Sequence, residues 1–88
     1  IDSVIEKIGD VKEVYLTGDF AKGINSQIID LLIVSDHLDK NFLVKLIDKA
    51  EAVITRKIRY VIMNLKEAKE YLAILESTEY LIIWREVE

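Results

Sequence analysis

The stretch from Val14 to Val34, VYLTGDFAKGINSQIIDLLIV, decides the fold of this chain. Two runs of β-branched and aliphatic residues flank a loop that contains Gly18 and Gly23. Short apolar runs bounded by turn residues are typical of strands that are covered on both faces of a sheet. The second run contains one charged residue, Asp30, which needs a partner or an open face because an unpaired buried carboxylate is costly.

Composition restricts the classes of function. The chain has 88 residues, a formal net charge of −4 and a sequence pI of about 5.0, with its charges mixed along the chain. Non-specific affinity for nucleic acid depends on clustered Lys and Arg, so we expect no direct nucleic-acid binding by this domain. No apolar run approaches the roughly 20 residues of a membrane span, so we expect a cytoplasmic protein with no membrane contact.

The chain is short but rich in hydrophobic residues. Hydrophobic residues make up 51% of the chain, which leaves two interpretations open, a strand-rich core or an apolar surface that docks on another protein. There are no cysteines, which excludes disulfides and thiolate metal sites. We expect residues 1–88 to form one domain. Because the chain starts with Ile1 and not with Met, we also expect it to be a fragment of a longer chain.

The order of elements predicts an α+β (α/β) fold in which helices back a small mixed sheet of about four strands. Apolar spacing and turn residues predict the order α-β-β-α-β-α-β, with helices at 2–8, 40–55 and 65–75 and strands at 13–17, 28–34, 57–63 and 79–85. Asn64 and Glu67 have the spacing of a capping box. We interpret Ser35 to Asp39 as a polar turn, with His37 solvated and Asp39 as a turn or helix-capping residue.

The stretch resembles the signature of the nucleotidyltransferase superfamily that includes polymerase β and the minimal nucleotidyltransferases. The matching residues are Gly18, Ala21, Lys22 and Gly23 of a Gly-Ser-x-Ala-Arg-Gly loop, and Asp30-Leu31-Leu32-Ile33 of an Asp-x-Asp-Leu-Leu strand. Two positions depart from the signature. Asp19 replaces the Ser of the loop, and Ile28 replaces the first Asp of the strand.

The resemblance implies a nucleotidyltransferase-like fold and three carboxylates on two neighbouring strands that hold two divalent ions. The third acid would lie near Arg59 or Tyr60, but the strand 57–63 contains no acid. With two of three carboxylates absent, we expect no catalytic residue, no metal site and no cofactor. Mg²⁺ and nucleotide are expected only if the domain is a minimal nucleotidyltransferase or a nucleotide-sensing module.

Five residues remain as vestigial or ligand-binding candidates: Gly18, Asp19, Lys22, Gly23 and Asp30. The loop glycines are either simple turn formers or part of an anion site built from backbone amides and a lysine. For Asp30 we favour an ion pair with Arg59 or Lys57 over a catalytic role.

Apolar residues in place of a polar cleft predict an interface. Ile28, Asp30, Leu32 and Val34 should point to one side of the sheet, and we expect this face to pack on a second copy or on an adjoining domain. The alternative interface is the last strand with Tyr80 and Trp84, which are otherwise core residues.

The resemblance also suggests a biological context. Domains that have lost the acids in this way look like those that follow winged-helix domains in bacterial transcriptional regulators. We therefore expect a non-catalytic regulatory or dimerisation domain, with a homodimer or an adjoining DNA-binding domain as its partner.

Overall fold

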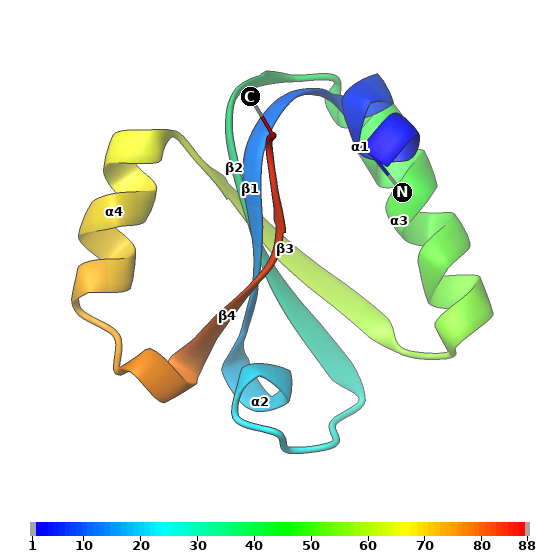
Figure 1. Ribbon diagram of the computed structural model, residues 1–88. Helices are drawn as coiled ribbons and strands as arrows, with labels where there is room; N and C mark the ends of the chain where they lie inside the picture. Colours follow the sequence, from blue (N-terminus) through cyan, green and yellow to red (C-terminus); the bar gives the residue numbers. More distant parts are fainter. Residues whose placement is uncertain (1, 88) are drawn as a thin grey trace.

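A computed structural model describes residues 2–87 of the chain, with side chains from Val4 onward, and Ile1 lies outside them. The structure is α+β, with one four-stranded sheet and helices on both of its faces, as the sequence predicts (Figure 1). The elements are α1 (Asp2–Ile8), β1 (Gly9–Thr17), α2 (Gly18–Ala21), β2 (Ile28–Leu38), α3 (Lys40–Ile54), β3 (Lys57–Met63), α4 (Leu65–Ala73), the 3-10 turn η1 (Ser77–Glu79) and β4 (Tyr80–Arg85).

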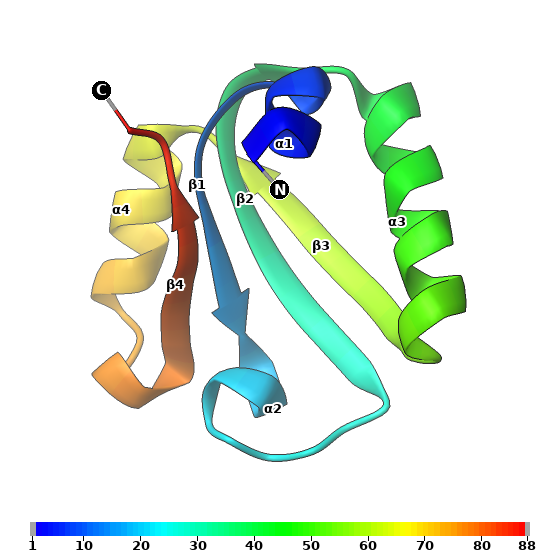
Figure 2. The same cartoon turned by 45° about the vertical axis from the view of Figure 1, so that its right-hand side comes forward.

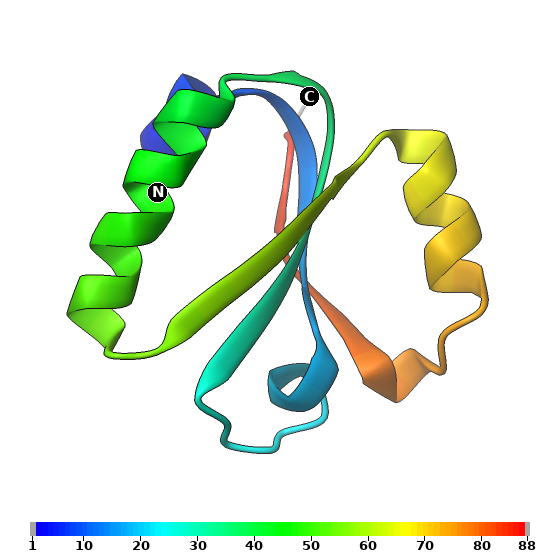
Figure 3. The same ribbon diagram turned by 180° about the vertical axis from the view of Figure 1, so that it is seen from behind.

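The sheet is mixed, with the strand order β3-β2-β1-β4. The inner strand β1 is antiparallel to its two neighbours, β2 and β4, while β2 and β3 are parallel. Parallel neighbours need a crossover connection, and α3 supplies it. Helices α1 and α3 lie on one side of the sheet and α4 lies on the other, as Figure 2 and Figure 3 show from two sides.

Each face of the sheet has its own hydrophobic core. Successive residues of a strand point to opposite faces, so the neighbours Leu32 and Ile33 contribute to different cores. The core under α1 and α3 is built on Ile8, Val11, Ile33 and Leu43, and the core under α4 on Tyr15, Leu32, Val34 and Ala68.

Polar side chains fix the beginnings of the two long helices. Asp39 caps α3 by accepting a hydrogen bond of 3.1 Å from the amide of Phe42. Asn64 accepts a bond of 2.8 Å from the amide of Glu67, whose carboxylate accepts one of 2.9 Å from the amide of Asn64. The capping box and the role of Asp39 are confirmed. Within residues 2–87, no helix combines the length and the apolar character that are needed to cross a membrane.

The predicted polar turn at 35–39 is wrong, because β2 continues to Leu38. Ser35 is buried, and its hydroxyl donates to the carbonyl oxygen of Asp10 at 2.6 Å and accepts from the amide of His37 at 3.1 Å. These bonds satisfy polar groups where the register of β1 and β2 shifts. The first strand accordingly begins at Gly9 and not at position 13.

The prediction that one face of β2 packs on a second copy or an adjoining domain is also partly wrong. Leu32 and Val34 are fully buried beneath α4 within this chain, so neither packs on a second copy. Tyr80 packs on the same core, with its ring edge-on to that of Tyr15 at a centroid distance of 5.9 Å, and Trp84 packs on the opposite core. The core interpretation of both aromatic residues is confirmed, and an additional interface role for them stays a prediction.

Candidate functional site

Four residues form a row across the sheet at the end of the α4 core. Strand pairing places Thr17 opposite Tyr80 and Asp30, and Asp30 opposite Arg59. Directly paired residues of neighbouring strands point to the same face. The row therefore lies on the same face of the sheet as Leu32 and Val34, next to the core beneath α4. Its polar side chains lie where the apolar contacts of that core end.

Asp30 and Arg59 form a two-point ion pair. Nε of Arg59 donates to Oδ1 at 2.7 Å, and Nη2 donates to Oδ2 at 3.1 Å. The hydrogen bond and the charge of Asp30 raise the pKa of Arg59, and the charge of Asp19 adds to the increase. The predicted pairing of the carboxylate is confirmed with Arg59, while Lys57 instead pairs with Glu51 at 3.5 Å.

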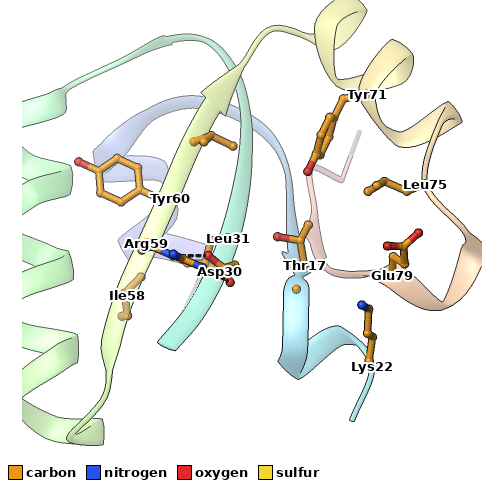
Figure 4. Close-up of a pocket in the computed structure, with 12 residues that line it drawn as sticks. Thr17, Lys22, Asp30, Leu31, Ile58, Arg59, Tyr60, Tyr71, Leu75 and Glu79 are labelled. Carbon is orange, nitrogen blue, oxygen red and sulfur yellow. Dashed lines mark hydrogen bonds and ion pairs between the residues drawn. The ribbon is translucent and has the colours of Figure 1, made fainter. Parts of the chain in front are cut away.

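The ion pair lines an open cavity of about 590 Å³ between the sheet, α2 and α4 (Figure 4). Its lining residues are Thr17, Gly18, Lys22, Asp30, Leu31, Ile58, Arg59, Tyr60, Val61, Tyr71, Leu75 and Glu79. Pockets for small molecules measure about 300–1,000 Å³, so this cavity is large enough for a nucleotide-sized ligand.

Several donors of the cavity are free for a ligand. Among the described residues, no hydrogen bond or ion pair engages the hydroxyl of Thr17, the ammonium group of Lys22 or the hydroxyl of Tyr71. Figure 4 shows the hydroxyl end of Tyr71 directed towards Thr17, and the side chain of Tyr60 on the far side of β3. The polar groups of the cavity therefore come from β1, β2, α4 and the loop after α2, together with Arg59 on β3 and Glu79 in η1.

Arg56 fixes the loop that joins α2 to β2. Its Nε donates to the carbonyl oxygen of Ser26 at 3.1 Å, and its Nη2 donates to the side chain of Asn25 at 2.9 Å. The guanidinium carbon also lies 5.4 Å from the ring centre of Phe20, a cation–π distance. The loop beside the cavity is therefore held in place from outside it.

The structure brings together three of the five ligand candidates. Gly18, Lys22 and Asp30 line the cavity. Asp19 is exposed on α2, and its backbone carbonyl accepts the amides of Lys22 and Ile24. Gly23 forms a turn away from the cavity, with a φ of +80°.

Sequence reasoning missed other lining residues, chiefly Thr17, Tyr71 and Glu79. Thr17 carried a usable signal because it ends a strand directly before the loop glycine. Tyr71 and Glu79 reach the cavity through the packing of α4 and η1, which no local pattern reveals.

The residues present do not fit the pair of divalent ions that the resemblance implies. Asp30 is the one carboxylate in the row, Arg59 occupies the expected position of an acid, and the half-buried Ile28 has no ligand atom. Within the described part of the chain, no three His, Cys, Asp or Glu residues come together in a group that can hold a metal ion. Mg²⁺ needs several oxygen ligands, which this site does not supply.

Comparison with known proteins gives fold neighbours. No protein-family model and no curated protein sequence matches the chain. A mutant MntA–HpeT toxin–antitoxin structure matches with a TM-score of 0.65 at 17% identity, and a toxin–antitoxin structure with AMP-PNP with 0.64 at 18%. Both matches cover 97% of this chain and 69% of the other chain.

A third neighbour is the tri-AMPylated HEPN toxin of Shewanella oneidensis in complex with MNT antitoxin. It matches with a TM-score of 0.58 at 17% identity, over 97% of this chain and 66% of the other chain. At such identities the likeness concerns the fold, and the chain has a nucleotidyltransferase-like fold.

Proposed function

We propose that this domain uses a nucleotidyltransferase-like fold to bind a nucleotide and a protein partner without transferring a nucleotidyl group. The observation that carries the proposal is the state of Asp30. Both of its oxygens accept hydrogen bonds from Arg59, and position 28 on the same strand is an isoleucine. The one acid that matches the signature is therefore already engaged by a cation of the protein.

The lack of transfer follows from the chemistry of the reaction. Two metal ions activate the attacking oxygen and stabilise the leaving oxygen in such sites. One carboxylate that shares its charge with a guanidinium supports neither role. The domain is thus better suited to binding than to turnover.

Nucleotide binding has separate support. The cavity has a suitable volume and carries Lys22 and Arg59, whose charges attract phosphate. One fold neighbour is a toxin–antitoxin structure with AMP-PNP, and another contains an AMPylated toxin. These neighbours favour the nucleotide-sensing alternative over a purely structural role.

Titration of the 88-residue chain with ATP and GTP, followed by calorimetry or by amide NMR shifts, tests the binding. We expect saturable binding with shifts at Thr17, Gly18 and Lys22. The absence of saturable binding of either nucleotide would contradict the nucleotide part of the proposal.

The second candidate is a regulatory or dimerisation domain of a bacterial transcriptional regulator, attached to a DNA-binding domain. Edge strand β4 favours it, because Leu81 and Ile83 are 54% and 52% exposed. Exposed apolar edge strands tend to pair with another protein. One fold neighbour is a HEPN toxin in complex with an MNT antitoxin, which also supports a protein partner. Sedimentation of the chain and of a variant with a charged edge strand tests this candidate.

A further inference from the structure

We infer that the guanidinium of Arg59 takes the place of a divalent cation in the cavity, so that the domain binds a phosphate-bearing ligand in its metal-free form. This inference rests on the proposed nucleotide binding. It adds the chemical state of the ligand, a free polyphosphate anion and not its Mg²⁺ complex.

The geometry of the ion pair is the first argument. Asp30 is held at both oxygens, at 2.7 and 3.1 Å, which is the fork-to-fork arrangement of a strong arginine–carboxylate pair. A metal ion on this carboxylate would have to displace the guanidinium or share the oxygens with it. Because arginine stays protonated at all ordinary pH values, the cation at this position cannot be removed by titration.

The second argument concerns the remaining capacity of Arg59. A guanidinium has five N–H donors, and the contacts with Asp30 use only two of its three nitrogens. The side chain is 64% exposed and lines the cavity. Arg59 can therefore hold the carboxylate and still donate to a phosphate oxygen, as a bridging metal ion would.

The third argument is the balance of charge in the cavity. Lys22 and Arg59 face the acids Asp30 and Glu79, so the unliganded lining is close to neutral. A free polyphosphate brings more negative charge to Lys22 and Arg59 than its Mg²⁺ complex does. Added Mg²⁺ therefore lowers the attraction and gains no ligand set in return.

The chain offers a matched control for Arg59. The pair of Arg85 with Glu13 also joins neighbouring strands, with an Nε–Oε2 distance of 3.1 Å and exposures of 66% and 17%. The corresponding exposures of Arg59 and Asp30 are 64% and 24%. Arg59→Gln and Arg85→Gln each remove one positive charge from a similarly exposed side chain. They differ in location, because Arg85 does not line the cavity.

The experiment measures the Kd of a fluorescent ATP analogue for the 88-residue chain in EDTA and in excess Mg²⁺. We expect binding in EDTA that Mg²⁺ leaves unchanged or weakens. Arg59→Gln should weaken the binding in EDTA by about tenfold or more, while Arg85→Gln should stay within about twofold. Binding that requires Mg²⁺, or equal Kd values for the two variants, would overturn the inference.

A second readout does not depend on nucleotide. Mn²⁺ is added to the 15N-labelled chain, and paramagnetic broadening of amide signals reports where the ion binds. We expect no selective broadening at Gly18, Asp30 and Arg59 in the unchanged chain, and its appearance in Arg59→Asp. Selective broadening in the unchanged chain would overturn the cation role of Arg59. Failure of ATP to bind in either buffer would instead remove the proposed nucleotide binding.

Discussion

Gly18 lies against the carboxylate of Asp30, and a Cβ at position 18 would be 2.6 Å from Oδ2. The same residue has a φ of +65°, in the left-handed region that non-glycine residues rarely adopt. The φ value favours glycine, and the short distance means that a Cβ at this position would push the carboxylate of Asp30 aside. Gly18 thus leaves room for the ion pair between Asp30 and Arg59.

Substitution of this glycine should separate the two effects. We expect Gly18→Ala to lower the free energy of unfolding by about 1–3 kcal/mol, through backbone strain and displacement of Asp30. Gly23→Ala is the matched control, because Gly23 has a φ of +80° but a Cβ there would meet no atom within 4 Å. Urea denaturation should show a smaller loss for Gly23→Ala, and equal losses would contradict a role of the contact with Asp30.

The purified chain should not transfer AMP, CMP, GMP or UMP in the presence of Mg²⁺ or Mn²⁺. The physical reason is the single, ion-paired carboxylate in the row. Incubation with α-³²P nucleotides and a set of protein acceptors checks this expectation. Time-dependent and metal-dependent labelling that disappears in Asp30→Asn would show that the domain is an enzyme.

The α4 core should contribute strongly to stability. Leu32 has 0% exposure, and its truncation to alanine leaves a cavity between β2 and α4. We expect Leu32→Ala to lower the free energy of unfolding by about 2–5 kcal/mol. Val53→Ala removes an aliphatic group that is 82% exposed and serves as the control. Chemical denaturation measures the free energy of unfolding of both variants. A loss of stability in Leu32→Ala that is no larger than in Val53→Ala would contradict the packing of Leu32 beneath α4.

Alkaline pH should destabilise the fold through Tyr15. Burial raises the pKa of this phenol, and the hydrogen bond to Glu13 and its charge add to the effect. A folded-state pKa above the ordinary value of 10.0 means that this stability is present below about pH 10 and is lost as pH rises through the folded pKa.

Between pH 8 and 11, the free energy of unfolding should therefore fall less steeply with pH for Tyr15→Phe than for the unchanged chain. The difference between the two slopes should correspond to about one proton per molecule at most. Some alkaline loss should persist, because the hydrogen bond and charge of Asp10 also raise the pKa of Lys12. Tyr60→Phe is the control, because the phenol of Tyr60 has no hydrogen-bond partner in the described part of the chain. An identical slope for Tyr15→Phe and the unchanged chain would refute the role of Tyr15.

Self-association, if the domain is a dimerisation module, should depend on β4. We expect the chain to sediment as a dimer at micromolar concentration and Leu81→Lys to make it a monomer, because a charge on an edge strand opposes strand pairing. Val53→Lys places the same charge at an exposed site on α3 and should not change the association. A chain that is monomeric throughout would remove the dimerisation candidate.

Local signals predicted the parts of this structure that depend on neighbouring residues. The capping box at Asn64, the strand β3 and the pairing of Asp30 with Arg59 follow from spacing, alternation and the cost of an unpaired charge. The fold class could be predicted for the same reason, since the element order is a sum of such local signals.

The remaining features depend on contacts between distant segments. Ser35 resembles a turn residue in the sequence, but its hydroxyl donates a hydrogen bond to the backbone carbonyl oxygen of Asp10 across the sheet. The sequence predicts an open face for Leu32 and Val34 because it does not show which face of the sheet α4 covers. The cavity is likewise assembled by tertiary packing, so only its strand and loop residues could be predicted.

The position of β4 has a consequence for how the chain folds. Strand β1 is central in the sheet, yet its neighbour on one side is the last strand, and Val14 pairs with Trp84 near the opposite end of the described chain. Pairing between such distant segments forms slowly because a long loop must close first. During synthesis, the hydrogen-bonding edge of β1 therefore stays uncovered until β4 has left the ribosome, and an uncovered strand edge of this kind exposes the nascent chain to aggregation.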